Sequence, residues 1–148
     1  MSGFVLSERI DSSRDEVFDY LTDLDNASKW MPDVTRIERL TDGPLAVGTR
    51  YRELRWTKRG EARTDMEVIT MDPPGRYAAT FDQGGYRATF SYTFSLDGTG
   101  TRVDMSCVLQ SRGGRTLMAP IVSWLLKRQD KHQLRNLKRA MEKGDEED

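Results

Sequence analysis

The chain has very little of several residue types on which common protein functions depend. Its one cysteine, Cys107, cannot form an internal disulfide and cannot alone supply the thiolates of a metal site. Its one histidine, His132, lies in a strongly basic segment, so no serine or cysteine has an evident basic partner for nucleophilic catalysis. Metal-binding spacings and a glycine-rich phosphate loop are also missing from the sequence. We therefore expect no metal and no other cofactor.

Long hydrophobic runs and an excess of one charge are missing as well. No segment approaches the roughly 20 apolar residues of a membrane span, and the N-terminus lacks the basic-then-apolar order of a secretory signal. With 23 basic and 24 acidic residues the net charge is −1, so no overall field favours nucleic acid. These features predict a cytoplasmic protein that has no integral membrane segment and binds no nucleic acid.

The 148 residues are enough to bury one substantial core, and no linker or repeat divides them. We expect a single domain over residues 1–143, followed by an acidic C-terminal tail at 144–148.

Strand and helix signals follow one another in an unusual order. A predicted strand at 4–10 precedes Ser13 and Glu16, a capping-box pair that begins a helix over 14–24. A short helical turn at 26–30 ends before Pro32. Turn residues then separate six β-rich runs, at 35–40, 49–57, 62–71, 77–82, 86–96 and 101–110. Their short links predict antiparallel hairpins, and the fold therefore contains seven strands in all.

The last predicted element is a long helix over 115–143. Its first half is apolar around more than half of its circumference, so we expect it to be deeply buried. A narrower apolar stripe follows, rotated from the first, which predicts a bend or a new packing partner near 127–131. The segment 127–143 carries seven basic and two acidic residues. A solvated helix face offset by the acidic tail explains this charge, and contact with an anionic membrane or a protein is the alternative.

Four local patterns accompany this order of elements. They are Ile-Asp-Ser-Ser at 10–13 with Glu-Val-Phe-Asp-Tyr-Leu-Thr-Asp at 16–23, Trp-Met-Pro-Asp-Val at 30–34, Val-Gly-Thr-Arg-Tyr at 47–51, and Leu-Arg-Asn-Leu-Lys at 134–138 with Glu142. Over nearly its whole length the chain thus resembles the START-like, or SRPBCC, superfamily of helix-grip proteins, and most closely the bacterial polyketide cyclase/dehydrase-like group. The resemblance implies an α+β fold in which a curved seven-stranded antiparallel sheet surrounds a long C-terminal helix. It also implies an internal pocket for an apolar small molecule.

Alternation along the strands indicates which side chains face the closing helix. The run 86–96 has one aromatic and apolar face and one polar face, and the last strand shows the same division. We expect Phe94, Val103 and Leu109 to fill the core. The candidate ligand-binding residues are Trp30, Tyr51, Glu53, Arg55, Trp56, Met66, Tyr77, Phe81, Phe90, Tyr92, Met105, Cys107, Ile121, Trp124 and Leu125. For each of them a purely structural role in the core is the alternative.

The strand at 49–57 leaves the polarity of the pocket open. If Tyr51 points inward, alternation brings Glu53 and Arg55 inside and leaves Leu54 and Trp56 in solvent. The buried charges then need each other or a polar ligand. If a bulge shifts the register, Leu54 and Trp56 line the pocket and the charges are exposed. The apolar register is slightly favoured.

Three functions fit this interpretation. The first is binding or carriage of an apolar metabolite that is aromatic, polyketide-like or lipid-like. The second is a cofactor-free cyclase or dehydratase in the same cavity, for which Glu53, Arg55, Tyr51 and Tyr92 are the catalytic candidates. The third is a protein-interaction module with a vestigial pocket.

Overall fold

The computed structural model describes residues 2–111 and 119–147 of the chain. In chain order its elements are β1 Ser2–Ile10, α1 Arg14–Thr22, a single 3-10 turn η1 Leu24–Asn26, α2 Ala27–Trp30, β2 Val34–Arg39, β3 Arg50–Thr57, β4 Gly60–Asp72, β5 Arg76–Gln83, β6 Tyr86–Asp97, β7 Gly100–Ser111, α3 Ala119–Asp130 and α4 Gln133–Glu147.

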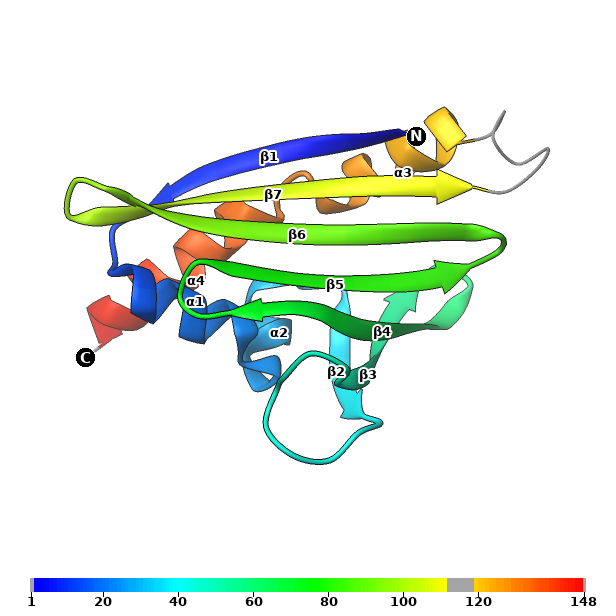
Figure 1. Ribbon diagram of the computed structural model, residues 1–148, viewed down its shortest axis with the longest axis horizontal. Coiled ribbons are helices and arrows are strands. Elements are labelled where there is room, and N and C mark those ends of the chain that lie inside the picture. The colour runs from blue at the N-terminus through cyan, green and yellow to red at the C-terminus, as the bar shows by residue number, and fades with distance from the viewer. Residues whose placement is uncertain (1, 112–118, 148) are drawn as a thin grey trace.

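The strands form one antiparallel sheet in the order β1-β7-β6-β5-β4-β3-β2. Strands β2 to β7 follow each other as a meander, and β1 pairs with β7 in a register that sets Phe4 opposite Cys107. Figure 1 shows a long curved sheet with the helices gathered on one of its faces. Helix α3 runs behind β1 and β7, whereas α1, α2 and α4 cover the other end. This arrangement confirms the predicted α+β helix-grip fold.

The predicted start of the first helix is confirmed in its geometry. Ser13 is the N-cap, and its hydroxyl oxygen accepts a hydrogen bond from the backbone N–H of Glu16 at 3.2 Å. Such a bond satisfies one of the amide groups left free in the first turn of a helix. The cap fixes where α1 leaves β1, and thereby how Val17, Phe18 and Leu21 meet the sheet.

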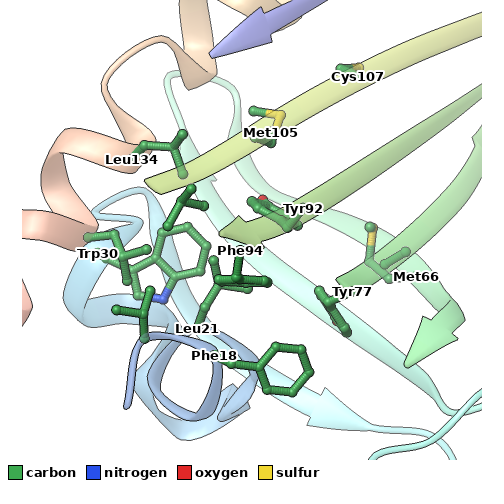
Figure 2. Packing of buried hydrophobic residues seen from close by; sticks show 14 of the residues in the cluster. Phe18, Leu21, Trp30, Met66, Tyr77, Tyr92, Phe94, Met105, Cys107 and Leu134 are labelled. Carbon is green, nitrogen blue, oxygen red and sulfur yellow. The ribbon is translucent and has the colours of Figure 1, made fainter. Parts of the chain in front are cut away.

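The core fills one end of the concave face, where α1, α2 and α4 meet the sheet. Phe18, Leu21, Trp30, Phe94 and Leu134 converge there from three helices and β6 (Figure 2). The rings of Phe18 and Phe94 meet edge to face, with centroids 5.2 Å apart. Tyr77, Tyr92 and Met66 extend this cluster along the sheet (Figure 2). The core therefore holds the helices against one end of the sheet and borders the inner faces of β4 to β6.

The C-terminal region differs from its prediction in three ways. A break at Lys131 and His132 divides the expected single helix, at the end of the region 127–131 where a bend was predicted. Helix α4 continues to Glu147, so the expected acidic tail is helical over 144–147. The expected first turn, residues 115–118, lies outside the described residues.

The third difference is the orientation of α3, which is not deeply buried. Ile121, Trp124 and Leu125 are 50%, 57% and 52% exposed, whereas Ala119 and Ser123 are buried against the protein. The prediction assigned the most apolar face to the interior. The face that actually packs inward has small side chains, Ala119 and Ser123, and also includes Asp130.

Candidate functional site

A cavity of about 480 Å³ lies between the concave face of the sheet and the helices. Strands β3 to β6 form its floor, and α2, α3 and the start of α4 border it. Nine of the predicted ligand-binding residues line this cavity: Trp30, Tyr51, Glu53, Arg55, Met66, Tyr77, Phe81, Phe90 and Tyr92. The size falls within the range of about 300–1,000 Å³ that is usual for small-molecule sites.

Strand β3 carries its charges into the cavity, against the register that the sequence slightly favoured. Tyr51, Glu53 and Arg55 line the cavity, and Trp56 is 68% exposed on the opposite face. Leu54, which strict alternation placed in solvent beside Trp56, is instead buried. The pairing of β3 with β4 is continuous, from Arg50 with Glu67 to Thr57 with Gly60. The bulge in this region lies on β2, between Val34 and Arg36, and it leaves the alternation of β3 unchanged.

The charges on β3 form an ion pair inside the cavity. An Nη atom of Arg55 donates a hydrogen bond to the Glu53 carboxylate at 3.1 Å, and their side chains are only 16% and 10% exposed. Burial opposes the charge on Arg55, but the carboxylates of Glu53 and then Asp130 keep its pKa above the ordinary value. Arg55 is therefore a permanently charged guanidinium at the wall of the cavity.

Asp130 lies at the end of α3 and lines the same cavity. Burial raises its pKa from 3.8 to about 6, because the attraction of Arg55 only partly offsets desolvation and the repulsion of Glu53 and Asp33. Among the described residues no hydrogen-bond donor to its carboxylate is found. Asp130 is thus a carboxyl group that gains and loses its proton close to neutral pH.

Three phenols stand beside the charged cluster. The hydroxyl groups of Tyr51 and Tyr77 are 3.3 Å apart, and Tyr92 donates a hydrogen bond to the Gln133 side-chain oxygen at 2.8 Å. Burial raises the pKa of Tyr77 to about 12 and raises the pKa values of Tyr51 and Tyr92 as well. All three therefore stay neutral at physiological pH and can act as hydrogen-bonding groups.

The remainder of the lining is mainly apolar and aromatic. Phe81 and Phe90 stack with ring centroids 6.0 Å apart, and Leu109, Val122 and Leu126 add aliphatic surface. Trp30 also lines the cavity, and its buried indole N–H has no acceptor among the described residues. The cavity thus combines an apolar body with a charged and hydroxyl-rich part.

Six predicted ligand-binding residues do not line the cavity. Met105 and Cys107 are buried in the core, because α1 and α3 pack on β7. Burial raises the pKa of the Cys107 thiol to about 12, which makes it unreactive. The other four residues are exposed. The register of β3 turns Trp56 outward, and the orientation of α3 turns Ile121, Trp124 and Leu125 outward.

Sequence reasoning missed five residues that line the cavity: Leu109, Val122, Leu126, Asp130 and Gln133. Leu109 was assigned to the core. The signal for three of the others was spacing: Val122, Leu126 and Asp130 follow one another at four-residue intervals on one face of α3. Because that face contains an acidic residue, a ranking of helix faces by hydrophobicity does not select it. No comparable signal marks Gln133, which begins α4.

Metal ligands and membrane-spanning helices are both lacking over residues 2–111 and 119–147. No group of three or more His, Cys, Asp and Glu side chains in this part of the chain is placed to hold a metal ion. None of the helices described there is long and apolar enough to cross a membrane.

A curved antiparallel sheet, a C-terminal helical region gripped by it and a cavity between them define a helix-grip protein. Residues 1–142 match the sequence model of the family described as polyketide cyclase/dehydrase and lipid transport. The chain belongs to this family, within the SRPBCC superfamily, as its local patterns predicted. Members of the superfamily typically bind hydrophobic ligands or act as polyketide cyclases.

Solved structures share the fold at low sequence identity. The chain is similar to TTHA0849 from Thermus thermophilus, with a TM-score of 0.74, 18% identity, and coverage of 94% of this chain and 96% of that one. It is similar to Ara h 8.0201, with a TM-score of 0.74, 14% identity, and coverage of 93% and 95%. It also matches BexL, a di-domain ARO/CYC protein of the BE-7585A biosynthetic pathway, with a TM-score of 0.81 and 13% identity over 96% of this chain and 47% of BexL. Among curated proteins no sequence matches.

Proposed function

We propose that this protein binds a small molecule that has an apolar, aromatic or lipid-like body and one polar hydrogen-bonding group. The observation that carries the proposal is the division of the cavity lining. Phe81, Phe90 and Met66 offer apolar surface to the body of the ligand. Arg55 and the phenols of Tyr51 and Tyr77 offer donors for its polar group.

The charged part of the lining favours a ligand with an acceptor oxygen. The Arg55 guanidinium has five N–H donors, and only one hydrogen bond to Glu53 is formed within the described structure, besides a long contact of 4.0 Å with the Met31 sulfur. The indole N–H of Trp30 likewise has no acceptor there. A carbonyl or hydroxyl oxygen would satisfy such donors, and satisfying a buried donor is worth about 1–3 kcal/mol.

The first test is occupancy and blockade of the cavity. Native mass spectrometry of freshly purified protein should show a co-purified small molecule, and the fluorescence of 1-anilinonaphthalene-8-sulfonate should rise when the probe enters the cavity. Thr64→Trp places an indole into the lining and should abolish both signals. Thr93→Trp, the matched control on an exposed position of β6, should leave them unchanged. Equal probe binding by Thr64→Trp and the unmodified protein would contradict the proposal.

Asp130 favours a second candidate function, a cofactor-free enzyme of the cyclase or dehydratase type. A carboxyl group with a pKa of about 6 can take a proton from a carbon next to a carbonyl and return it near neutral pH. The positive charge of Arg55 would stabilise the enolate oxygen that forms when the carbon loses its proton. Asp130 returns to its carboxylate form when it delivers the proton to the carbon, or to a hydroxyl group on the neighbouring carbon that then leaves as water.

This second function can be tested without knowing the product. A co-purified carbonyl compound, incubated with the protein in heavy water, should gain deuterium at the carbon next to the carbonyl. Asp130→Asn should remove this exchange but keep the ligand bound. If the unmodified protein exchanges no faster than buffer does, binding without catalysis remains as the function. The third function, an interaction module with a vestigial pocket, has little support because a cavity of about 480 Å³ is not a collapsed core.

A further inference from the structure

The outer face of α3 is both apolar and basic. Ile121, Trp124 and Leu125 follow the three- and four-residue spacing of a single helix face and are each at least half exposed. Elsewhere on the described surface the large exposed hydrophobic side chains are set among strands and loops, for example Val5, Val47 and Leu96. Here three of them share one face of one helix. That concentration is more than the scattered apolar residues of an ordinary surface require.

The charges around this face are of one sign. Lys127 and Arg128 in the last turn of α3, and Lys131 just after it, are exposed, and the guanidinium of Arg128 lies 5.5 Å from the centre of the Trp124 ring. The acidic residue of α3, Asp130, points to the cavity and is buried. The described outer face of α3 therefore offers apolar and cationic side chains only, although the chain as a whole has a net charge of −1.

The inner face of the same helix forms part of the cavity wall. Val122 and Leu126 line the cavity, one turn apart. The cavity reaches solvent at Thr57, Arg63 and Gln83, which are exposed lining residues near the β3–β4 and β5–β6 hairpins. Figure 1 shows both hairpins and α3 in the same half of the molecule, away from the C-terminus. A surface that met the outer face of α3 would thus lie near the opening of the cavity.

We propose that the outer face of α3, defined by Ile121, Trp124, Leu125, Lys127 and Arg128, docks onto an anionic lipid bilayer. A helix that lies in a membrane interface has this composition, with Trp and aliphatic residues on one side and Lys or Arg bordering them. The basic border indicates that the binding surface is an anionic membrane, because Lys and Arg attract anionic headgroups. The tryptophan ring suits the boundary between headgroups and acyl chains. The docked helix brings the cavity opening close to a store of apolar molecules. The docking itself does not depend on whether the cavity is occupied.

The test is sedimentation with vesicles of phosphatidylcholine alone and of phosphatidylcholine with about one third phosphatidylglycerol. The protein should sediment with the anionic vesicles at low salt, and should be released at high salt. Lys127→Gln with Arg128→Gln should lower partitioning on anionic vesicles by roughly thirtyfold, because each basic residue near the surface contributes about a fivefold factor. The matched control, Arg50→Gln with Arg76→Gln, removes two exposed charges from the starts of β3 and β5 and should bind as the unmodified protein does.

A second measurement locates the contact. Tryptophan emission should shift to shorter wavelength when anionic vesicles are added. Trp124→Phe should remove that shift, while Trp56→Phe should retain it, although Trp56 is also exposed. Leu125→Ser should weaken partitioning more than tenfold, and Leu96→Ser, at an exposed site on the β6–β7 hairpin, should not.

Three results would overturn the proposal. One is that the unmodified protein stays in the supernatant with anionic vesicles at low salt. Another is that Trp124→Phe and Trp56→Phe give the same spectral shift. The third is a dimer in analytical ultracentrifugation that Leu125→Ser dissociates while vesicle binding is absent, because a second copy of the chain would then be the occupant of this face.

Discussion

Asp130 should make the folded protein less stable as pH rises, and replacing it should reverse this effect. The pKa of a free aspartate is 3.8 and that of Asp130 is about 6, so the folded protein holds the proton more tightly than the unfolded chain does. Since the folded-state pKa is raised, the penalty is absent below pH 4, develops between about pH 4 and 6, and is fully present above pH 6. A shift of roughly two units corresponds to about 3 kcal/mol.

Asp130→Asn removes the charge at nearly constant side-chain size and keeps Arg55 paired with Glu53. Urea unfolding at pH 8 should therefore show Asp130→Asn to be more stable than the unmodified protein, by up to about 3 kcal/mol. At pH 4 the two proteins should have nearly equal free energies of unfolding. Asp42→Asn, at an exposed position between β2 and β3, is the control and should change stability by less than about 0.5 kcal/mol at either pH.

Two results would refute this reasoning. A loss of stability in Asp130→Asn at pH 8 would mean that the carboxylate is favourably paired rather than repelled. A gain of the same size at pH 4 and pH 8 would mean that the substitution acts through packing and not through the charge. If the predicted gain is found, Asp130 is a residue kept at the expense of stability, which is typical of groups retained for binding or catalysis.

The other predictions concern the hydrogen-bonded and buried groups around the cavity. Arg55→Gln should destabilise the protein by about 3 kcal/mol in urea unfolding at pH 8, because it leaves buried Glu53 and Asp130 without their cation. Glu53→Gln should destabilise the protein less, since Asp130 still faces Arg55. A larger loss of stability in Glu53→Gln would disprove the role of Arg55 as the shared cation. Tyr92→Phe should lower the free energy of unfolding by about 1–2 kcal/mol through loss of the bond to Gln133, and no change would mean that water replaces it. The Cys107 thiol should be inert to 5,5′-dithiobis(2-nitrobenzoic acid) at pH 8 until urea unfolds the protein, and rapid reaction of the native protein would contradict its burial.

Most of the sheet could be predicted because its local signals and its long-range pairing agree. Strand β6 alternates strictly between apolar and polar side chains, and Ala88, Tyr92 and Phe94 are accordingly buried while Thr93 between them is exposed. Turn residues such as Gly84 and Gly98, which adopt positive φ angles, fix where one strand ends and the next begins. Each hairpin then restricts the register of the following strand, so that few alternative arrangements remain.

The sequence left the register of β3 open, with a slight preference for the apolar one, and predicted the orientation of α3 wrongly. Both segments depart in the same direction from the rule that apolar side chains face the interior. Each turns apolar side chains to the outside, Trp56 from β3 and Trp124 from α3. Each turns charged side chains to the cavity, the Glu53–Arg55 pair from β3 and Asp130 from α3. Assigning the interior by hydrophobicity fails at both, because it treats burial of apolar area as the only term that sets orientation.

In each segment, strand pairing or helix packing outweighed the burial of apolar area, for a definite reason. The eight-residue ladder between β3 and β4 fixes the alternation of β3, and exposing one tryptophan is less unfavourable than breaking it. Helix α3 is oriented by Ala119 and Ser123, small side chains that allow close packing on the sheet. The polar groups of β3 and α3 thereby meet across a single cavity. Local rules are expected to fail where a site is built, and their joint failure at β3 and α3 is an independent reason to place the polar part of the site between them.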